Sequence, residues 1–235
     1  MSTATAKPNW FIQMISSTIG KKLIMALTGL FLITFLVVHL LGNLQLLKGD
    51  NGVTFNKYAH FMGHNPLIQT ISVVNFTFIL LHVVYAIILA RLNTQARPQP
   101  YVYVQPQASS PWYARNMMLL GTIVLIFIVV HLQNFWFQMK FGYVAKVTYD
   151  NVEYKDLYTM TKEAFANPVI VAFYVLAMVG LAYHLAHGFQ SAFQTLGLRH
   201  VKYTPVIQFV GKVFCIVVPL LYAMIPIIMY IQSLS

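Results

Sequence analysis

Five histidines of this 235-residue chain lie inside long apolar stretches, and their side chains are the ones best suited to chemistry. His39 and His131 share the sequence Val-Val-His-Leu, and the other three are His82, His184 and His187. An ionisable side chain in apolar sequence is costly, so it indicates a function unless a nearby hydroxyl or carbonyl satisfies it. A single histidine would suit that structural role, whereas five together favour a functional one.

The composition limits what this chemistry can be. Hydrophobic residues make up 58% of the chain and charged residues only 9%, far fewer than in a soluble domain, so we expect a membrane protein. The single cysteine, Cys215, excludes an internal disulfide, a cysteine-ligated iron–sulfur cluster and covalently attached haem.

The elements that must position the histidines are five long stretches with almost no charged residue. Each is long enough to cross a hydrocarbon layer of about 30 Å as a helix. Open sheets would leave backbone groups unpaired in lipid, and the sequence lacks the short alternating segments of a barrel, so we predict an all-α fold. The expected helices lie near 22–47, 66–91, 112–140, 167–195 and 204–232 and form a domain spanning 22–235, after a cytoplasmic or interfacial segment at 1–21. A linker rich in Pro and Gln at 92–111 and a long external loop at 141–166 complete the chain.

Basic residues are distributed unevenly between the two ends of these helices. If the N-terminus is cytoplasmic, that side carries nine basic residues and no acid, against six basic residues and all five acids on the other. The positive-inside rule therefore predicts a cytoplasmic N-terminus. The net charge of +10 follows from this topology and gives no support for nucleic-acid binding. The nine residues are Lys7, Lys21, Lys22, Arg91, Arg97, Arg115, Arg199, Lys202 and Lys212.

The predicted helices place the histidines at two depths. At about 1.5 Å per residue, His39 and His131 lie roughly 25 and 28 Å from the cytoplasmic ends of their helices. His82 and His184 lie only about 14 and 16 Å from that side. We therefore expect an outer pair, His39 with His131, and an inner pair, His82 with His184. His187 is three residues from His184 on the same helix face, so depth alone does not decide between these two.

Two imidazoles that face each other from different helices can ligate both axial positions of a haem iron, while apolar neighbours hold the macrocycle. The two pairs thus predict two b-type haems stacked across the bilayer, which is a path for electrons. Glycines such as Gly29 and Gly121 would let a flat cofactor or a helix approach closely. Zinc is disfavoured because the pairs differ by about 11 Å in depth. A proton relay is disfavoured because the spans contain no acid, and structurally satisfied histidines remain the alternative.

Several segments that carry these histidines resemble the five-helix, dihaem cytochrome b membrane anchor, the b558 type, of succinate dehydrogenases and fumarate reductases. The resemblance runs over nearly the whole chain, and the order and spacing of its parts carry it. The segments are SSTIGKKLIMALTGLFLITFLVVHLLGN, FNKYAHFM, LLHVVYAI, LIFIVVHLQ and HLAHGFQSAFQTLG.

The resemblance implies a role for each histidine in the spans. His39, followed four residues later by Asn43, and His131 would ligate the distal haem. His82, which precedes the aromatic Tyr85, and His184 would ligate the proximal haem. The family's glycines four and thirteen residues after the fourth-helix ligand match Gly188 and Gly197, which selects His184 and leaves His187 as a propionate contact or alternative ligand. Further implied propionate partners are Arg91, Arg97 and Arg115.

The resemblance also implies partners and a reaction. A flavoprotein with FAD would oxidise succinate, and an iron–sulfur subunit on the cytoplasmic side would pass electrons through both haems to a quinone, with menaquinone favoured. This chain alone would not oxidise succinate, and it would lie in the inner membrane of a bacterium. Ala182 stands where some relatives have a glutamate linked to proton movement, so we do not expect that movement here. The candidate quinone contacts are Asn43, Gln45, His60 and His64, the last two in a loop.

Two other functions remain open at this stage. One is a dihaem cytochrome b subunit of another membrane oxidoreductase, such as a hydrogenase or a formate dehydrogenase. The other is a haem-free transporter or scaffold. A spectrum of the purified chain separates the haem proteins from the last class, and the identity of the co-purifying subunits separates the first two.

Overall fold

Five long apolar helices dominate the computed structural model, which describes residues 9–96 and 111–234. Lys7, Arg97 and most of the predicted linker lie outside the described residues. The five spans confirm the predicted number and order, and each predicted range overlaps its observed span closely. They run Thr18–Leu47, Pro66–Gln95, Met117–Phe141, Pro168–Thr195 and Thr204–Ser233. The chain is therefore a multi-pass helical membrane protein.

The first span begins earlier than expected, because Ser17 caps it. The Ser17 hydroxyl accepts a hydrogen bond from the Gly20 backbone N–H at 3.0 Å, and helix α2 then runs Thr18–Asn43. A 3-10 turn, η1 (Leu44–Leu47), completes the span. A short exposed helix, α1 (Trp10–Ser16), precedes it within the predicted interfacial segment.

The predicted helix over 112–140 is interrupted at Asn116, and the third span begins after that residue. Helix α6 (Trp112–Arg115) ends at Asn116, where the chain leaves helical geometry, and α7 (Met117–His131) follows. A π-helical turn, η2 (Leu132–Phe137), begins directly after His131, and α8 (Gln138–Phe141) closes the span. Such π turns inside helices occur often at functional sites.

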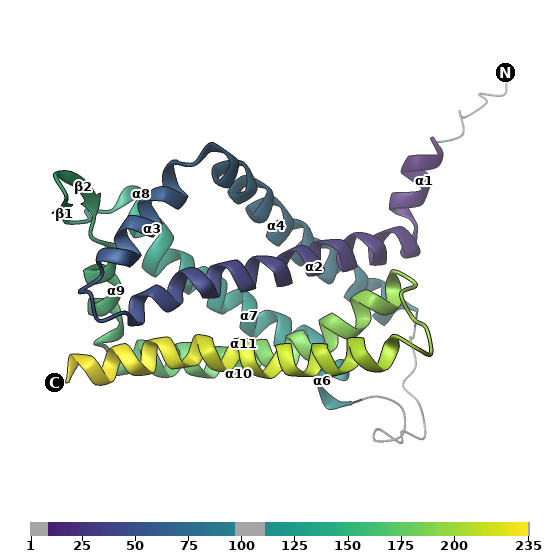
Figure 1. Ribbon diagram of the computed structural model, residues 1–235. Helices are drawn as coiled ribbons and strands as arrows, with labels where there is room; N and C mark the ends of the chain where they lie inside the picture. The colour runs from purple at the N-terminus through teal and green to yellow at the C-terminus, as the bar shows by residue number, and fades with distance from the viewer. Residues whose placement is uncertain (1–8, 97–110, 235) are drawn as a thin grey trace.

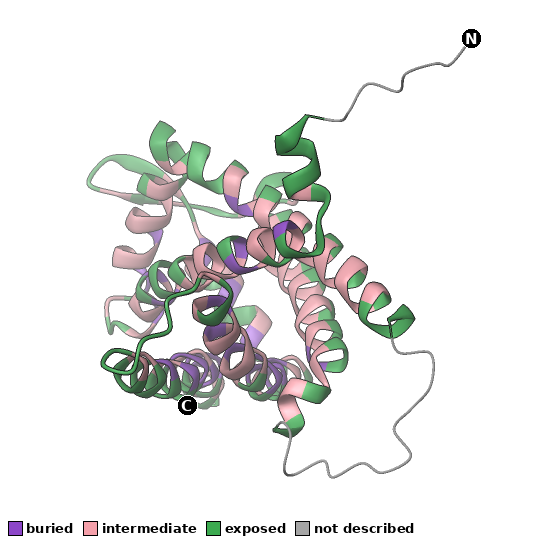
Figure 2. Cartoon of the chain, turned by 90° about the vertical axis from the view of Figure 1, so that its right-hand side faces the viewer, coloured by how far each residue is buried: buried purple, intermediate pink, exposed green. Residues whose placement is uncertain are grey.

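The remaining spans are single helices that pack as a bundle. Helix α4 (Pro66–Gln95) lies against α2, and α7 lies against α10 (Pro168–Thr195). Helix α11 (Thr204–Ser233) runs beside α10, as Figure 1 shows. Seen end-on, exposed positions cover the outside of the bundle and buried positions lie between helices (Figure 2). Most fully buried apolar residues belong to α2, α9, α10 and α11, so these elements form the core.

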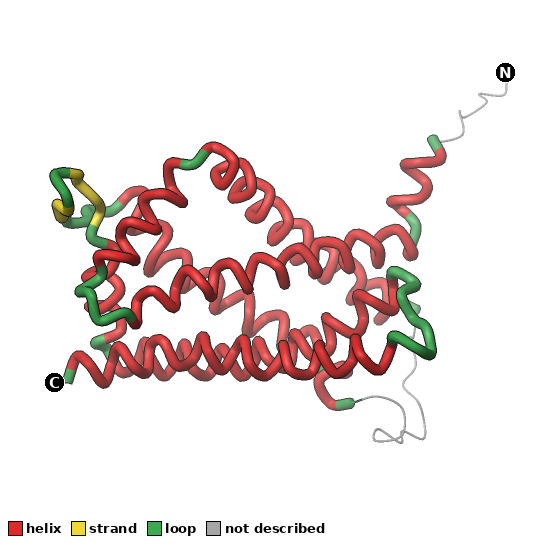
Figure 3. Tube along the Cα trace, viewed as in Figure 1, coloured by secondary structure: helices red, strands yellow, loops and turns green. Residues whose placement is uncertain are grey.

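One end of the bundle carries a polar cap, which we define as α3 (Val53–His64), strands β1 (Lys146–Tyr149) and β2 (Val152–Lys155), and α9 (Leu157–Phe165). Figure 3 shows the two strands at this end only. The all-α prediction thus holds for the spans, while the long loop predicted at 141–166 contains a hairpin and a helix. His60 and His64 lie on α3 and not in a loop as predicted, because this short polar segment is helical.

The hairpin has a local physical cause. Asp150 and Asn151 at its turn both have positive φ, 50° and 61°, the conformation of a tight turn that matches the twist of antiparallel strands. Tyr149 and Val152 then face each other across the strands. β-branched and aromatic residues favour the extended backbone on both sides of the turn.

A buried amide joins α3 to the external loop that follows the third span. Asn56, only 1% exposed, donates to the Asp156 carboxylate at 3.0 Å and to the Tyr149 hydroxyl at 3.3 Å. Its own oxygen accepts from the Tyr158 backbone N–H at 3.0 Å. The cap therefore connects the loop between α2 and α4 with the loop between α7 and α10.

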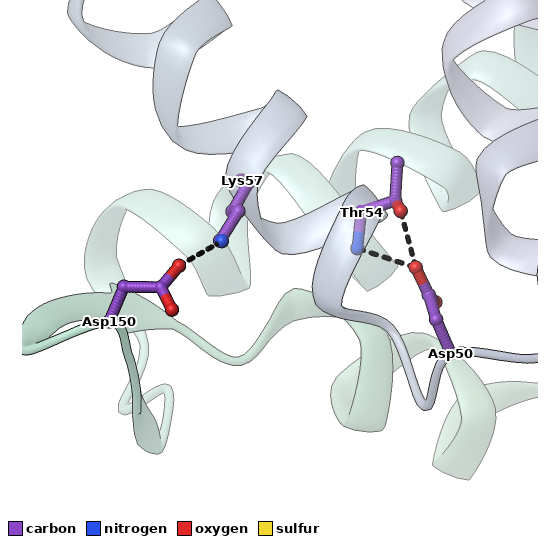
Figure 4. A network of polar contacts seen from close by, with 4 residues as sticks. All are labelled: Asp50, Thr54, Lys57 and Asp150. Atoms are coloured by element: carbon purple, nitrogen blue, oxygen red, sulfur yellow. Dashed lines mark hydrogen bonds and ion pairs between the residues drawn. The ribbon is translucent and has the colours of Figure 1, made fainter.

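An exposed ion pair lies beside this amide. Lys57 contacts Asp150 at 2.5 Å, and Asp50 accepts hydrogen bonds from the hydroxyl and the backbone N–H of Thr54 (Figure 4). The hydroxyl of Thr54 lowers the pKa of Asp50 below its ordinary value, so this carboxylate stays charged at neutral pH. Exposed pairs such as Lys57–Asp150 contribute little to stability.

Replacing Asn56 by alanine should destabilise the cap, because it removes a buried amide that hydrogen-bonds to Tyr149 on β1, to Asp156 and to the backbone of Tyr158 on α9. We expect Asn56→Ala to lower the free energy of unfolding by about 1–3 kcal/mol. Lys57→Ala, which removes only an exposed ion pair, is the control and should have a much smaller effect. Thermal unfolding in detergent and hydrogen exchange across residues 146–165 measure both. Equal effects of the two substitutions would contradict the role given to Asn56.

Candidate functional site

The outer pair brings His39 on α2 against His131 at the end of α7. Their ring centroids are 5.8 Å apart, and the rings are perpendicular, with an interplanar angle of 89°. Each ring stacks on the phenylalanine four residues before it, Phe35 at 5.2 Å and Phe127 at 5.5 Å. Residues four apart share a helix face, so both phenylalanines hold their histidines in place.

The inner pair brings His82 on α4 against His184 on α10. Their ring centroids are 6.3 Å apart, with an interplanar angle of 63°. The Nδ1 atom of His82 lies 3.2 Å from the Thr28 hydroxyl on α2. The Nδ1 atom of His184 is buried, and the described residues offer it no hydrogen-bond partner. Buried polar atoms nearly always have a partner, so an orphaned imidazole nitrogen beside a second imidazole suits metal ligation.

Two glycines leave room beside the inner pair. A β-carbon at Gly29 on α2 would lie 3.4 Å from Cε1 of His82, and one at Gly121 on α7 would lie 3.8 Å from Cε1 of His184. Larger side chains at either position would meet an imidazole. Both glycines had been expected to admit a flat cofactor or a helix, and they lie where such a group would need the space.

The structure therefore brings together the histidines that the sequence places at equal depth. The ring that faces His82 belongs to His184, while His187, half-buried, lies one helical turn further along α10. Each pair combines one histidine from α2 or α4 with one from α7 or α10. The pairs thus join the first half of the chain to the second.

The spacing of both pairs suits a shared metal between the two rings. Imidazole nitrogens bind metals at about 2.0–2.1 Å, which puts the centroids of two rings on opposite sides of one ion about 6 Å apart. Among the described residues, no three His, Cys, Asp or Glu side chains come together as ligands. Haem iron needs only two axial protein ligands, so each pair has the donor set for one b-type haem.

A hydroxyl also contacts the outer pair. The Tyr174 hydroxyl on α10 lies 3.5 Å from Nδ1 of His131 and accepts a hydrogen bond from the Asn134 amide at 3.4 Å. On the other side, the ring of Tyr222 on α11 lies 6.1 Å from that of His39, and its hydroxyl donates to the Leu36 carbonyl at 2.6 Å. The sequence interpretation did not identify these tyrosines, because depth does not reveal which way a helix face points.

The four predicted quinone contacts lie at or next to the cap end. The Asn43 amide donates to the His39 carbonyl at 2.7 Å, so it already has a partner, and Gln45 lies on η1. His60 and His64 stack on each other with centroids 4.0 Å apart. Nδ1 of His64 lies 2.7 Å from the His60 carbonyl, its hydrogen-bond partner. Arg91 and Arg115, two of the predicted propionate partners, are exposed at the opposite end.

An open surface depression of about 380 Å³ lies on the π turn directly after His131. It is lined by Leu132, Gln133, Trp136 and Phe137. The centroids of the Trp136 ring and the Phe76 ring on α4 are 5.3 Å apart. Gln133 is the one amide among apolar and aromatic neighbours here, and it is exposed. The sequence interpretation did not single out Gln133 or Trp136, although a glutamine inside an uncharged span is a signal that could have drawn attention to this turn.

Similarity to a characterised protein supports the family that the sequence resembles. The chain is 24% identical, over 165 residues, to a protein named succinate dehydrogenase cytochrome b558 subunit from Bacillus subtilis (strain 168). The two proteins are distant homologues. The alignment covers 70% of this chain and 72% of the relative. No family model matches the chain, and no solved structure matches it significantly.

Proposed function

We propose that this chain is the cytochrome b membrane anchor of a succinate:quinone oxidoreductase, and that it carries electrons between an iron–sulfur subunit and a quinone. The observation that carries the proposal is the presence of two facing histidine pairs at different depths of one bundle. The similarity to the Bacillus subtilis subunit adds support for the complex.

In this proposal the outer pair, His39 with His131, holds the distal haem, and the inner pair, His82 with His184, holds the proximal one. When bound, each haem iron would accept and release one electron at a time. The stacked rings of Phe35 and Phe127 fix the orientation of the outer imidazoles. The proposed propionate contacts are His187 and the guanidinium groups of Arg91 and Arg115, since a guanidinium matches the geometry of a carboxylate.

The partners follow from the same proposal. A flavoprotein with FAD and an iron–sulfur subunit would dock on the cytoplasmic side, opposite the cap, where the basic residues cluster. The chain would lie in the inner membrane of a bacterium with its N-terminus in the cytoplasm. With one cysteine, the sequence offers no set of cysteine ligands for an iron–sulfur cluster, and we propose that succinate oxidation belongs to the partners.

The quinone would react near the outer pair, at the cap end of the bundle. A quinone head group needs a hydrogen-bond donor beside an apolar slot. Gln133 and Trp136 offer this combination on the turn that follows His131. Asn43, Gln45, His60 and His64 remain candidates as well, although the Asn43 amide is engaged with a backbone carbonyl. The apolar chain environment suits a lipid-soluble quinone, with menaquinone proposed on the family resemblance.

Substituting single histidines tests the pairing. His39→Ala and His131→Ala should lose the same haem, and His82→Ala and His184→Ala should lose the other, because one axial ligand is removed in each case. Reduced-minus-oxidised spectra and pyridine haemochrome content per polypeptide measure the loss. We expect two haems in the unmodified chain and one in each of these variants.

His187→Ala is the matched control for His184→Ala and should retain both haems. Loss of a haem in His187→Ala, with both kept in His184→Ala, would reverse the assignment of the inner ligand. An unmodified chain without the α-band of b-type haem would leave a haem-free scaffold or transporter. Co-purification with hydrogenase or formate dehydrogenase subunits, rather than a flavoprotein, would indicate the other dihaem class.

Gln133→Leu tests the quinone site without touching a haem ligand. Losing one hydrogen bond to a substrate costs about 0.5–1.5 kcal/mol, so we expect quinone reduction to fall by about two- to tenfold with both haems retained. Steady-state reduction of a short-chain quinone by the intact complex measures this. Gln194→Leu is the control, because Gln194 is also exposed but lies at the C-terminal end of α10, away from the π turn. It should leave quinone reduction unchanged. If a His60→Ala, His64→Ala double variant reduces quinone poorly while Gln133→Leu does not, the quinone site would lie at α3 and not at the π turn.

A further inference from the structure

The hydroxyl of Thr28 donates its hydrogen to a backbone carbonyl of its own helix, α2. Thr28 is 3% exposed, and its Oγ1 donates to the Ile24 carbonyl at 2.8 Å, with the Met25 carbonyl at 3.1 Å. A threonine hydroxyl carries one hydrogen and accepts through its lone pairs. The contact of 3.2 Å to Nδ1 of His82 therefore requires the imidazole to be the donor.

This direction fixes the tautomer of His82. A neutral imidazole carries its hydrogen on one nitrogen only, so a ring that donates from Nδ1 leaves Nε2 bare. A bare Nε2 is the form that binds a metal. The chain thus prepares one ring of the inner pair for ligation through a residue on a third helix, α2, which supplies no ligand to that pair.

The outer pair has a parallel arrangement. Tyr174 is 5% exposed, and its oxygen lies 3.5 Å from Nδ1 of His131 while the Asn134 amide donates to it. If His131 ligates through Nε2, its Nδ1 carries the hydrogen and donates it to the Tyr174 oxygen. Each pair therefore has one ring whose Nδ1 faces a buried hydroxyl on a helix other than those of the pair.

We propose that Thr28 and Tyr174 are positioning residues, one for the inner and one for the outer haem. Each accepts the Nδ1–H of one axial histidine and holds its Nε2 toward the iron. A hydrogen bond of this kind makes the imidazole a stronger electron donor, which favours ferric iron and lowers the reduction potential of that haem. This inference rests on the proposed function, because it assumes that the paired histidines ligate haem.

Three substitutions at Thr28 separate the hydroxyl from the volume of the side chain. Thr28→Val keeps the shape without the acceptor, Thr28→Ala removes both, and Thr28→Ser keeps the acceptor. Redox titration of the purified complex, followed by absorbance, should give a higher midpoint potential for the inner haem in the Val and Ala variants, with the outer haem unchanged. The Ser variant should match the unmodified chain. Where a variant binds the inner haem poorly, haem occupancy is compared instead: it should fall in the Val and Ala variants and stay unchanged in the Ser variant.

The pattern across the three variants decides the matter. Inner-haem potentials and occupancies that are the same in all three as in the unmodified chain would overturn the role of Thr28. So would a Ser variant that behaves like Val and Ala, since packing would then be the cause. An unmodified complex without two haems would instead refute the proposed function, and this is measured before any variant is made.

Tyr174 has a matched control on α11. Tyr174→Phe should raise the potential of the outer haem only, because it removes the acceptor for Nδ1 of His131. Tyr222→Phe removes a half-buried hydroxyl near the same pair, but that hydroxyl donates to the Leu36 carbonyl and not to an imidazole. It should leave the potential of the outer haem unchanged. Equal shifts in the two variants, or none in Tyr174→Phe, would refute the role of Tyr174.

Discussion

An imidazole inside a bilayer must have a partner, because hydrocarbon offers no water to satisfy its nitrogens. This constraint explains the arrangement of the whole bundle. Helices of fixed rise bring His39 level with His131 and His82 level with His184, so each ring meets another ring. Phe35 and Phe127 stack on the outer rings, and the hydroxyls of Thr28 and Tyr174 lie near one ring of each pair. The outward faces of the helices carry mostly apolar side chains.

The pairs also explain how the two halves of the chain are joined. Helices α2 and α4 each supply one ring, and α7 and α10 supply the others. At the cap end, Asn56 connects the two loops that lie between the helices of each half. Contacts inside the membrane and a polar network outside it therefore hold the same two units together.

The number of spans, their order and the pairing of depths could be predicted from the sequence, because uncharged length and helical rise are nearly independent of tertiary context. The rotation of each helix could not. Thr28 and Tyr174 are ordinary residues in an apolar run, and only the packing of α2 and α10 turns them toward a histidine. The π turn after His131 has no simple sequence rule. The hairpin could have been expected from Asp150 and Asn151 at its turn, whereas His60 and His64 were wrongly assigned to a loop.

The crosswise origin of each pair has a consequence for biogenesis. Membrane helices enter the bilayer as the chain is made, so α2 and α4 are inserted before α7 and α10 exist. During that interval His39 and His82 have no opposing ring. If the pairs hold haem as proposed, neither site is complete until the second half has been inserted, and a chain that ends after α4 would retain neither haem.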